Sequence, residues 1–124
     1  MKDINFANYS TCKKKGDKLN YMTIRMDDDL IDKMDLYCKE KKINKSQFIR
    51  AIIDYSCDEI DNNEEFRNLV LSLPDQIADG KNRKKKTYGL TDEVIARLKE
   101  VKEKYRIYNV NAAINESVKT FFES

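Results

Sequence analysis

The 124-residue chain contains no histidine, no tryptophan, one proline and only three glycines. Without histidine, the usual acid–base group near neutral pH is missing, and neither a Ser-His-Asp nor a Cys-His catalytic arrangement can form. We therefore expect the protein not to be an enzyme. The scarcity of proline and glycine favours helices, because these residues interrupt helices most strongly.

Cysteine is also scarce, and its three copies, Cys12, Cys38 and Cys57, form no C-x-x-C pair. With no imidazole, a Cys/His zinc site is excluded, and with only three thiols an all-cysteine site would lack its fourth ligand. We expect no metal, no cofactor and no small-molecule substrate. We interpret the cysteines as reduced, which predicts a cytoplasmic protein, and Cys38 as a small core residue.

Long hydrophobic runs are absent from the sequence. No apolar stretch approaches the roughly 20 residues that span a bilayer, and the N-terminal sequence MKDINFANYS lacks an apolar signal core. We therefore expect neither secretion nor a membrane partner. The length predicts one compact domain or two very small motifs that share a core.

The net charge is only +2, but the charges are unevenly distributed. Residues 13–26 hold five basic residues against one acid, and residues 81–90 hold five basic residues and no acid. Residues 57–80 hold one basic residue against seven acids. Basic clusters are typical of proteins that bind a polyanion, although lysine runs taken alone also occur as solvated linkers.

The first regular pattern along the sequence is that of a β-strand. Met22, Ile24 and Met26 alternate with more polar residues, as in a strand with one buried face. Asp27 is a suitable N-cap for a helix over residues 28–41, and Asn44 for a second helix that runs to about residue 56. Both segments carry an apolar stripe at helical spacing.

The same pattern returns 64 residues later. Met26-Asp27-Asp28-Asp29-Leu30-Ile31 corresponds to Leu90-Thr91-Asp92-Glu93-Val94-Ile95. Thr91 is the expected cap of a helix over residues 92–105, and Asn109 of a helix over residues 110–122, with Tyr108 in the apolar position before that cap. A strand–helix–helix unit therefore occurs twice. In the acidic connector, an apolar stripe predicts a short helix near residues 64–73, ended by Pro74.

Two segments of the sequence resemble the ribbon–helix–helix superfamily, the β-ribbon DNA readers of the Arc, MetJ and CopG type. The first reads YMTIRMDDDLIDKMDLYCKEKKINKSQFIRAII, and the second, weaker match reads KKKTYGLTDEVIARLKEVKEKYRIYNVNAAINESV. The resemblance implies a mainly α fold with a two-stranded antiparallel β-ribbon. Two motifs in one chain, as in TraY-like plasmid transfer proteins, imply an intramolecular pseudo-dimer. We accordingly divide the chain into a basic N-terminal arm (1–18), a first motif (19–57), a connector (58–83) and a second motif (84–124).

The resemblance also implies a function: sequence-specific binding of double-stranded DNA, with the outer face of the ribbon in the major groove. Such a protein would serve as a repressor or in plasmid copy control, partition or transfer. The two strands differ, which predicts an asymmetric target bound mainly through the first strand. The implied base-contacting residues are Tyr21, Thr23, Arg25, Lys85 and Thr87, with Gly89 in the remaining position of the second strand.

Phosphate contacts are implied at the starts of the two second helices, where Asn44, Lys45 and Ser46 correspond to Asn109, Val110 and Asn111. The basic clusters add Lys18 and Lys84 as phosphate contacts, and Lys86 stands where the pattern expects an inward apolar residue. The connector stripe either packs on the bundle or serves self-association on DNA. The alternative function is a protein-interaction adaptor, antitoxin-like or for partition, that uses the helical core or the connector.

Overall fold

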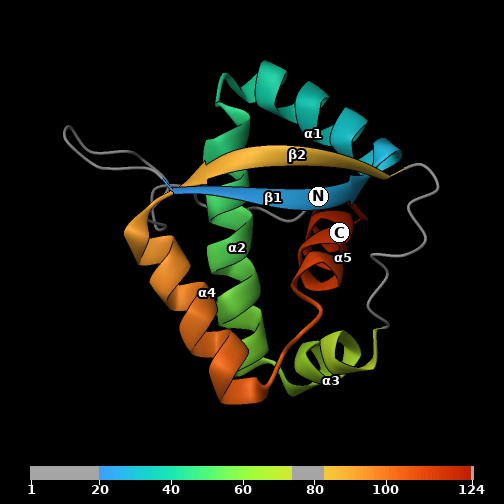
Figure 1. The fold of residues 1–124 in the computed structure, drawn as a ribbon. Coiled ribbons are helices and arrows are strands. Elements are labelled where there is room, and N and C mark those ends of the chain that lie inside the picture. The colour runs from blue at the N-terminus through green and yellow to red at the C-terminus, as the bar shows by residue number, and fades with distance from the viewer. Residues whose placement is uncertain (1–19, 74–82, 124) are drawn as a thin grey trace.

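The computed structural model describes residues 20–73 and 83–123 and, at residues 83 and 84, the backbone alone. These residues form a mainly helical protein with a two-stranded antiparallel sheet (Figure 1), which confirms the predicted fold class at that level. The elements, in chain order, are β1 (Asn20–Asp27), α1 (Asp28–Lys41), α2 (Lys45–Asn62), α3 (Glu64–Ser72), β2 (Arg83–Leu90), α4 (Asp92–Tyr105) and α5 (Val110–Glu123). The predicted arm over residues 1–18 lies outside the described residues.

The helices begin where the capping residues predicted. The side chain of Asn44 accepts a hydrogen bond from the Gln47 backbone N–H at 2.6 Å, and the Thr91 hydroxyl accepts one from the Val94 N–H at 3.3 Å. Asp27 occupies the cap position of α1, but its side chain makes no capping hydrogen bond. The expected bounds of α1 and α4 are confirmed, because cap and apolar stripe agree there.

The prediction for the end of α2 was wrong, since the helix continues to Asn62 instead of stopping near residue 56. Cys57 and Ile60 are both buried, so packing stabilises the extra turn beyond the predicted stripe. Asn63 then separates α2 from α3, and its side chain accepts a hydrogen bond from the Phe66 N–H at 3.1 Å. The predicted connector helix is confirmed as α3.

Helices α1 and α4 end in the same way. The residue after each, Lys42 and Arg106, has a left-handed backbone with φ of 58° and 55°. The next residue, Ile43 or Ile107, donates its N–H to a carbonyl in the last turn of its helix, at 3.1 and 3.0 Å. This is the Schellman ending, in which the second residue beyond the helix also makes an apolar contact.

That ending corrects one expectation about the turn before α5. Ile107 is buried, whereas Tyr108, which we expected in the apolar position, is 78% exposed. The Schellman geometry assigns the apolar contact to the residue directly after Arg106, so Tyr108 becomes the extra residue of a longer turn.

The sheet forms within one chain, because β1 pairs with β2. Thr23 lies opposite Thr87 at the centre of the register, with their Oγ1 atoms 3.2 Å apart. The shift of 64 residues that relates the two units also maps Thr23 onto Thr87, so the central pair consists of equivalent residues. One face of the sheet is buried on the helices through residues that alternate along each strand: Ile24, Met26, Tyr88 and Leu90.

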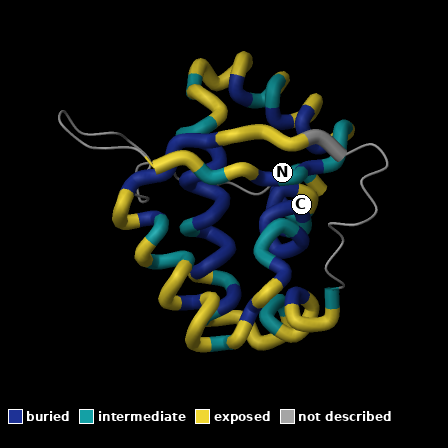
Figure 2. The backbone as a smooth tube through the Cα atoms, viewed as in Figure 1, coloured by how far each residue is buried: buried dark blue, intermediate teal, exposed yellow. Residues whose placement is uncertain are grey.

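The core lies beneath this buried face, and α2 passes through its centre (Figure 1). Figure 2 shows buried backbone along most of α2, whereas α1 and α4 alternate between buried and exposed positions. The largest fully buried side chains come from the sheet and all five helices of the described residues: Phe48, Phe121, Ile24, Met26, Met34, Ile49, Ile52, Ile53, Leu90, Ile114, Val70 and Val94. None of these helices is both long and apolar enough to cross a membrane.

On the side where α1 meets α5, aromatic rings close the core; we call this the aromatic flank. Tyr37 and Phe121 stack edge to face with centroids 5.2 Å apart, and Phe121 and Phe122 are 5.1 Å apart. Phe48 of α2 completes the cluster, 5.5 Å from Phe121. Edge-to-face ring pairs of this kind add stability beyond the apolar area that they bury.

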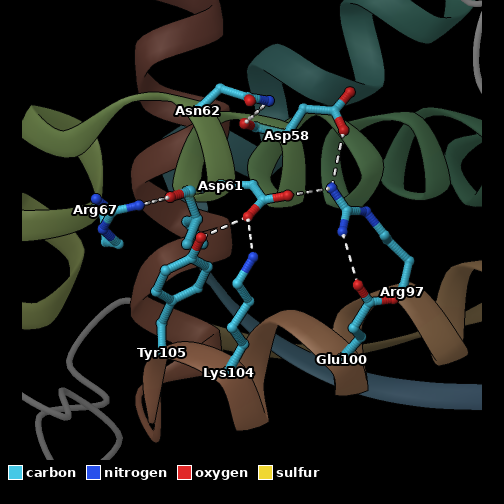
Figure 3. Close-up of polar contacts among 9 residues, drawn as sticks. Asp58, Asp61, Asn62, Arg67, Arg97, Glu100, Lys104 and Tyr105 are labelled. Carbon is cyan, nitrogen blue, oxygen red and sulfur yellow. Dashed lines mark hydrogen bonds and ion pairs between the residues drawn. The ribbon is translucent and has the colours of Figure 1, made fainter.

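On the side where α2 meets α4, charged groups meet instead; we call this the ionic flank (Figure 3). Asp61 of α2 accepts hydrogen bonds from the Tyr105 hydroxyl at 2.5 Å and from Lys104 Nζ at 3.0 Å, and Arg97 Nη2 lies 3.4 Å away. The same guanidinium lies 3.3 Å from Asp58. The hydrogen bond from Tyr105, followed by that from Lys104, lowers the pKa of Asp61 from 3.8 to about 2.

Candidate nucleic-acid interface

The candidate interface is the outer face of the sheet, opposite the helices. Alternation along the strands and the register place Tyr21, Thr23 and Arg25 of β1 on this face together with Lys85 and Thr87 of β2. Tyr21 is 72% exposed, Arg25 is half-buried, and the other three are exposed. The structure therefore brings the five expected base-contacting residues onto one face, over strands that are about 60 residues apart in sequence.

The chemistry of this face suits base edges. Two hydroxyl groups lie at its centre, and a guanidinium and an ammonium group lie near them. Threonine hydroxyls can donate or accept, while arginine and lysine donate to the acceptor atoms that guanine presents in the major groove. A two-stranded ribbon is also one of the elements that the major groove admits.

Side chains of helix α2 form hydrogen bonds with the backbone of β2 near the C-terminal end of that strand. Ser46 Oγ accepts a hydrogen bond from the Gly89 N–H at 3.1 Å, and Arg50 Nη1 donates to the Gly89 carbonyl at 2.8 Å. Arg50 is almost fully buried. The outer edge of β2 is thus hydrogen-bonded at Gly89, although no third strand is present among the described residues.

Side chains of helix α5 form corresponding hydrogen bonds with the backbone of β1. Asn111 Oδ1 accepts from the Arg25 N–H at 3.1 Å, and Asn115 donates to the Arg25 carbonyl at 2.6 Å. Asn115 Oδ1 also accepts from the Asp27 N–H at 3.2 Å. These bonds fix the backbone from which the Arg25 side chain projects.

Sequence reasoning missed the role of Arg50 and Asn115. A shift of 65 residues maps Ser46 onto Asn111 and Arg50 onto Asn115, so each strand is held by the second helix of the other unit. The available signal was a polar residue within an apolar helical stripe: FIRAII surrounds Arg50, and AINES surrounds Asn115. A buried polar group of this kind needs a partner, and here the partner is the edge of a strand.

The start of α2 lies beside this ribbon and is exposed. Asn44 caps the helix, and Lys45, whose side chain is 55% exposed, forms an ion pair of 3.1 Å with Asp35. Next to them is an open groove of about 530 Å³, whose lining includes Lys39, Lys45 and Lys86. Lys86 therefore reaches solvent, although alternation places it on the inner face of β2. The groove explains how a lysine occupies a position where we expected an apolar residue.

The start of α5 differs from that of α2. Asn109 is buried, and its side-chain amide donates to the carbonyls of Val70 and Leu73, each at 2.8 Å. That amide therefore closes the C-terminal end of α3, while the Asn109 backbone carbonyl accepts from the Ala113 N–H at 3.0 Å. Val110 is half-buried and apolar. The two helix starts that we expected to act alike consequently carry different side chains and different partners.

Two further expected phosphate contacts remain predictions. Lys18 lies outside the described residues. Lys84 lies opposite Met26 in the register, but its side chain is not among those described.

The described cysteines lie away from this face. Cys38 and Cys57 are free and buried, and burial raises the pKa of their thiols to about 11 and about 12. Cys38 is a core residue, as predicted. Across residues 20–73 and 83–123, no group of three or more cysteine and carboxylate side chains is arranged to hold a metal ion.

The chain was compared with protein-family models, with curated proteins and with solved structures, and none of the three comparisons gave a match. Any function of the outer face of the sheet must therefore be inferred from its own side chains.

Proposed function

We propose that the protein is a tandem ribbon–helix–helix pseudo-dimer that binds double-stranded DNA in a sequence-specific manner. The outer face of the β1–β2 ribbon would enter the major groove. The single observation that carries this proposal is that Tyr21, Thr23, Arg25, Lys85 and Thr87 share one face of a two-stranded sheet. Both edges of that sheet are hydrogen-bonded to helices, which keeps the face rigid.

Rigidity favours the proposal for a physical reason. A two-stranded sheet is only marginally stable in water by itself. Here Arg50 and Asn115 bond the backbone of Gly89 and Arg25, and four apolar side chains anchor the inner face. Base contacts are formed from a prearranged surface, so little conformational entropy is lost on binding.

The phosphate backbone would be held at the starts of α2 and α5. Free N–H groups and the helix dipole favour an anion at such positions. At α2, Lys45 adds a positive charge. Its ion pair with Asp35 is exposed, and exposed pairs contribute only about 0–1 kcal/mol, so a phosphate group can replace Asp35 at little cost.

Within this function, the proposed roles are repression or plasmid copy control, partition or transfer, as the resemblance to the ribbon–helix–helix superfamily implies. The proposed partner is duplex DNA, with self-association of bound molecules as an additional feature.

The proposal is tested by selecting duplexes from random sequence and measuring their affinity at several salt concentrations. We expect sequence-specific, salt-sensitive binding, since phosphate contacts release counterions. Arg25→Ala should weaken binding by about 1–3 kcal/mol and reduce the preference at one base pair. Lys99→Ala, an exposed lysine on α4 away from the ribbon, is the control and should bind normally. An Arg25→Ala protein with unchanged affinity and preference would contradict the proposed function.

A second candidate function is a protein-interaction adaptor, favoured by apolar side chains exposed on α3. Leu69 and Leu71 are 41% and 48% exposed, and Tyr108 lies in the turn directly before Asn109, which bonds the end of α3. A gel shift with unrelated DNA at low and moderate salt separates the two functions. A module that binds only proteins would show no salt-sensitive retardation.

A further inference from the structure

The register reveals where the positive charges of the ribbon lie. Arg25 is paired with Lys85, and Tyr21 is paired with Gly89, on either side of the central Thr23–Thr87 pair. Both cations therefore lie at one end of the outer face, which we call the cationic end. The other, which we call the neutral end, carries a phenol and a glycine.

This arrangement changes the expected asymmetry. From the sequence alone, the first strand appeared as the main reading strand, because it carries Arg25 and the second strand carries Gly89 at the equivalent position. In an antiparallel pair, however, the C-terminal half of one strand lies beside the N-terminal half of the other. Arg25 and Lys85 consequently act together although they come from different strands, and the asymmetry runs from end to end of the ribbon.

The separation of the two ends can be compared with the spacing of base pairs. The Arg25–Lys85 pair and the Tyr21–Gly89 pair are four residues apart along each strand, which corresponds to about 14 Å at roughly 3.4 Å per residue. Successive base pairs are about 3.4 Å apart. For a ribbon whose strands run along the groove, the two ends would lie over base pairs about four steps apart, and each would address its own part of a target.

The surroundings of the ends also differ. Asp27 follows Arg25 on the outer face, at the cap of α1, and lies opposite Arg83 in the register. The neutral end adjoins the start of α2, because Ser46 bonds Gly89. The groove next to α2 is lined by Lys39, Lys45 and Lys86, and Lys86 lies beside Lys85 on the cationic side of the central pair. Side-chain donors for bases thus gather at one end, and the start of α2 with Lys45, which is suited to phosphate, lies beside the other.

We infer that the protein recognises an asymmetric duplex whose guanine-dependent preference is confined to one side, where Arg25 and Lys85 read neighbouring base pairs together. The other side is held through its phosphates by Lys45 and the start of α2. This inference rests on the proposed function and makes Lys85 a specificity-determining residue equal in kind to Arg25, since both side chains donate to guanine O6 and N7.

The test is a series of single base-pair substitutions in the selected duplex, measured with the unaltered protein and with four variants. Arg25→Ala and Lys85→Ala should each lose discrimination by about 5- to 150-fold, at base pairs within two steps of each other. Arg25→Lys should retain affinity but lose part of its guanine preference, because lysine cannot pair bidentately in the fixed geometry of arginine. Tyr21→Arg should create a new guanine preference about four base pairs away.

Melting temperatures of all four variants provide the folding control, and we expect them to match the unaltered protein. If Arg25→Ala and Lys85→Ala act about four base pairs apart, or if Tyr21→Arg creates a preference beside that of Arg25, the end-to-end inference is overturned while DNA binding stands. Equal binding of every duplex by the unaltered protein overturns the proposed function itself.

Discussion

The two strand–helix–helix units of this chain, residues 20–62 and 83–123, have the same order of elements. The two flanks along which the units meet, however, close the core with different chemistry. Aromatic rings pack where α1 meets α5. Where α2 meets α4, Asp61 instead accepts hydrogen bonds from a tyrosine and two basic side chains. The units also hold each other's strands differently, with Ser46 and Arg50 in one and Asn111 and Asn115 in the other.

Comparing the two units separates the positions that have the same role in both from the positions where different side chains serve. Both units retain a left-handed residue after their first helix, an apolar residue directly beyond it, and a central threonine in the strand. These positions set backbone direction and register. The side chains that fill the flanks differ, because either ring packing or hydrogen-bonded charges can close a gap between helices.

The largest effect should come from the aromatic flank. Phe121 is fully buried against Tyr37 and Phe48, so Phe121→Ala should lower the free energy of unfolding by about 3–5 kcal/mol. Chemical denaturation measures this loss. Tyr108→Ala, at an exposed aromatic residue, is the matched control and should change stability by no more than about 0.5 kcal/mol. A Phe121→Ala loss near that of the control would show that the rings do not close the core.

The next largest effect should come from the side chains that hydrogen-bond the backbone of the two strands. Arg50→Met and Asn115→Leu each remove hydrogen bonds to a strand and leave backbone groups unsatisfied, which should destabilise each variant by about 1–3 kcal/mol. Denaturation curves and amide exchange of the sheet would report both losses. If Arg50→Met is destabilised and Asn115→Leu is not, the two contacts are not equivalent, and only β2 is held by its helix.

A smaller effect is expected from the unequal helix starts. Under the proposed function, Lys45→Ala should remove one phosphate contact and reduce the slope of log affinity against log salt by about 0.9. The equivalent position in the second unit is Val110, and Val110→Lys should increase that slope by a similar amount. Lys99→Ala is the control for a general loss of charge. An unchanged slope in Lys45→Ala would remove the start of α2 from the interface.

The smallest effect concerns the ionic flank and appears only in acid. The pKa of Asp61 is lowered from 3.8 to about 2 by its hydrogen bonds to Tyr105 and Lys104, so its contribution to stability is present above pH 3.8. That contribution should be lost as the pH falls from about 4 to about 2. Asp61→Asn should therefore flatten the fall in stability over this window, as measured by denaturation at a series of pH values. Glu103→Gln on α4 is the control, and equal slopes in both variants would contradict the role of Asp61.

The sequence predicted much of the fold because local signals agreed. Asn44 and Thr91 marked helix starts, apolar stripes gave the bounds of α1 and α4, and the shift of 64 residues indicated which strand pairs with β1. The end of α2 was missed because Ile60 is buried by elements distant in sequence. Tyr108 and Ile107 were interchanged because both are apolar, and only the left-handed Arg106 determines which one turns inward.

For the candidate site, the sequence predicted which side chains share one face of the strand but not which residues of the two strands lie opposite each other. Alternation placed Thr23 and Arg25 on the same side of the strand, but the pairing of Arg25 with Lys85 requires the register. Asn109 was expected as the cap of α5 and as a backbone phosphate contact. The bonds that its side chain makes to α3 are contacts that no local pattern indicates. Polar residues such as Arg50 and Asn115 take their roles from strands that are 39 and 90 residues away.

The two strands of the ribbon belong to one polypeptide, and this has a consequence for how the protein would respond to its own abundance. A ribbon assembled from two chains disappears on dilution, and occupancy of its target then rises with the square of protein concentration. Here the two strands are covalently joined, so folding alone completes the outer face of the ribbon. Under the proposed function, target occupancy would follow the first power of concentration, without a threshold, down to a few copies of the chain.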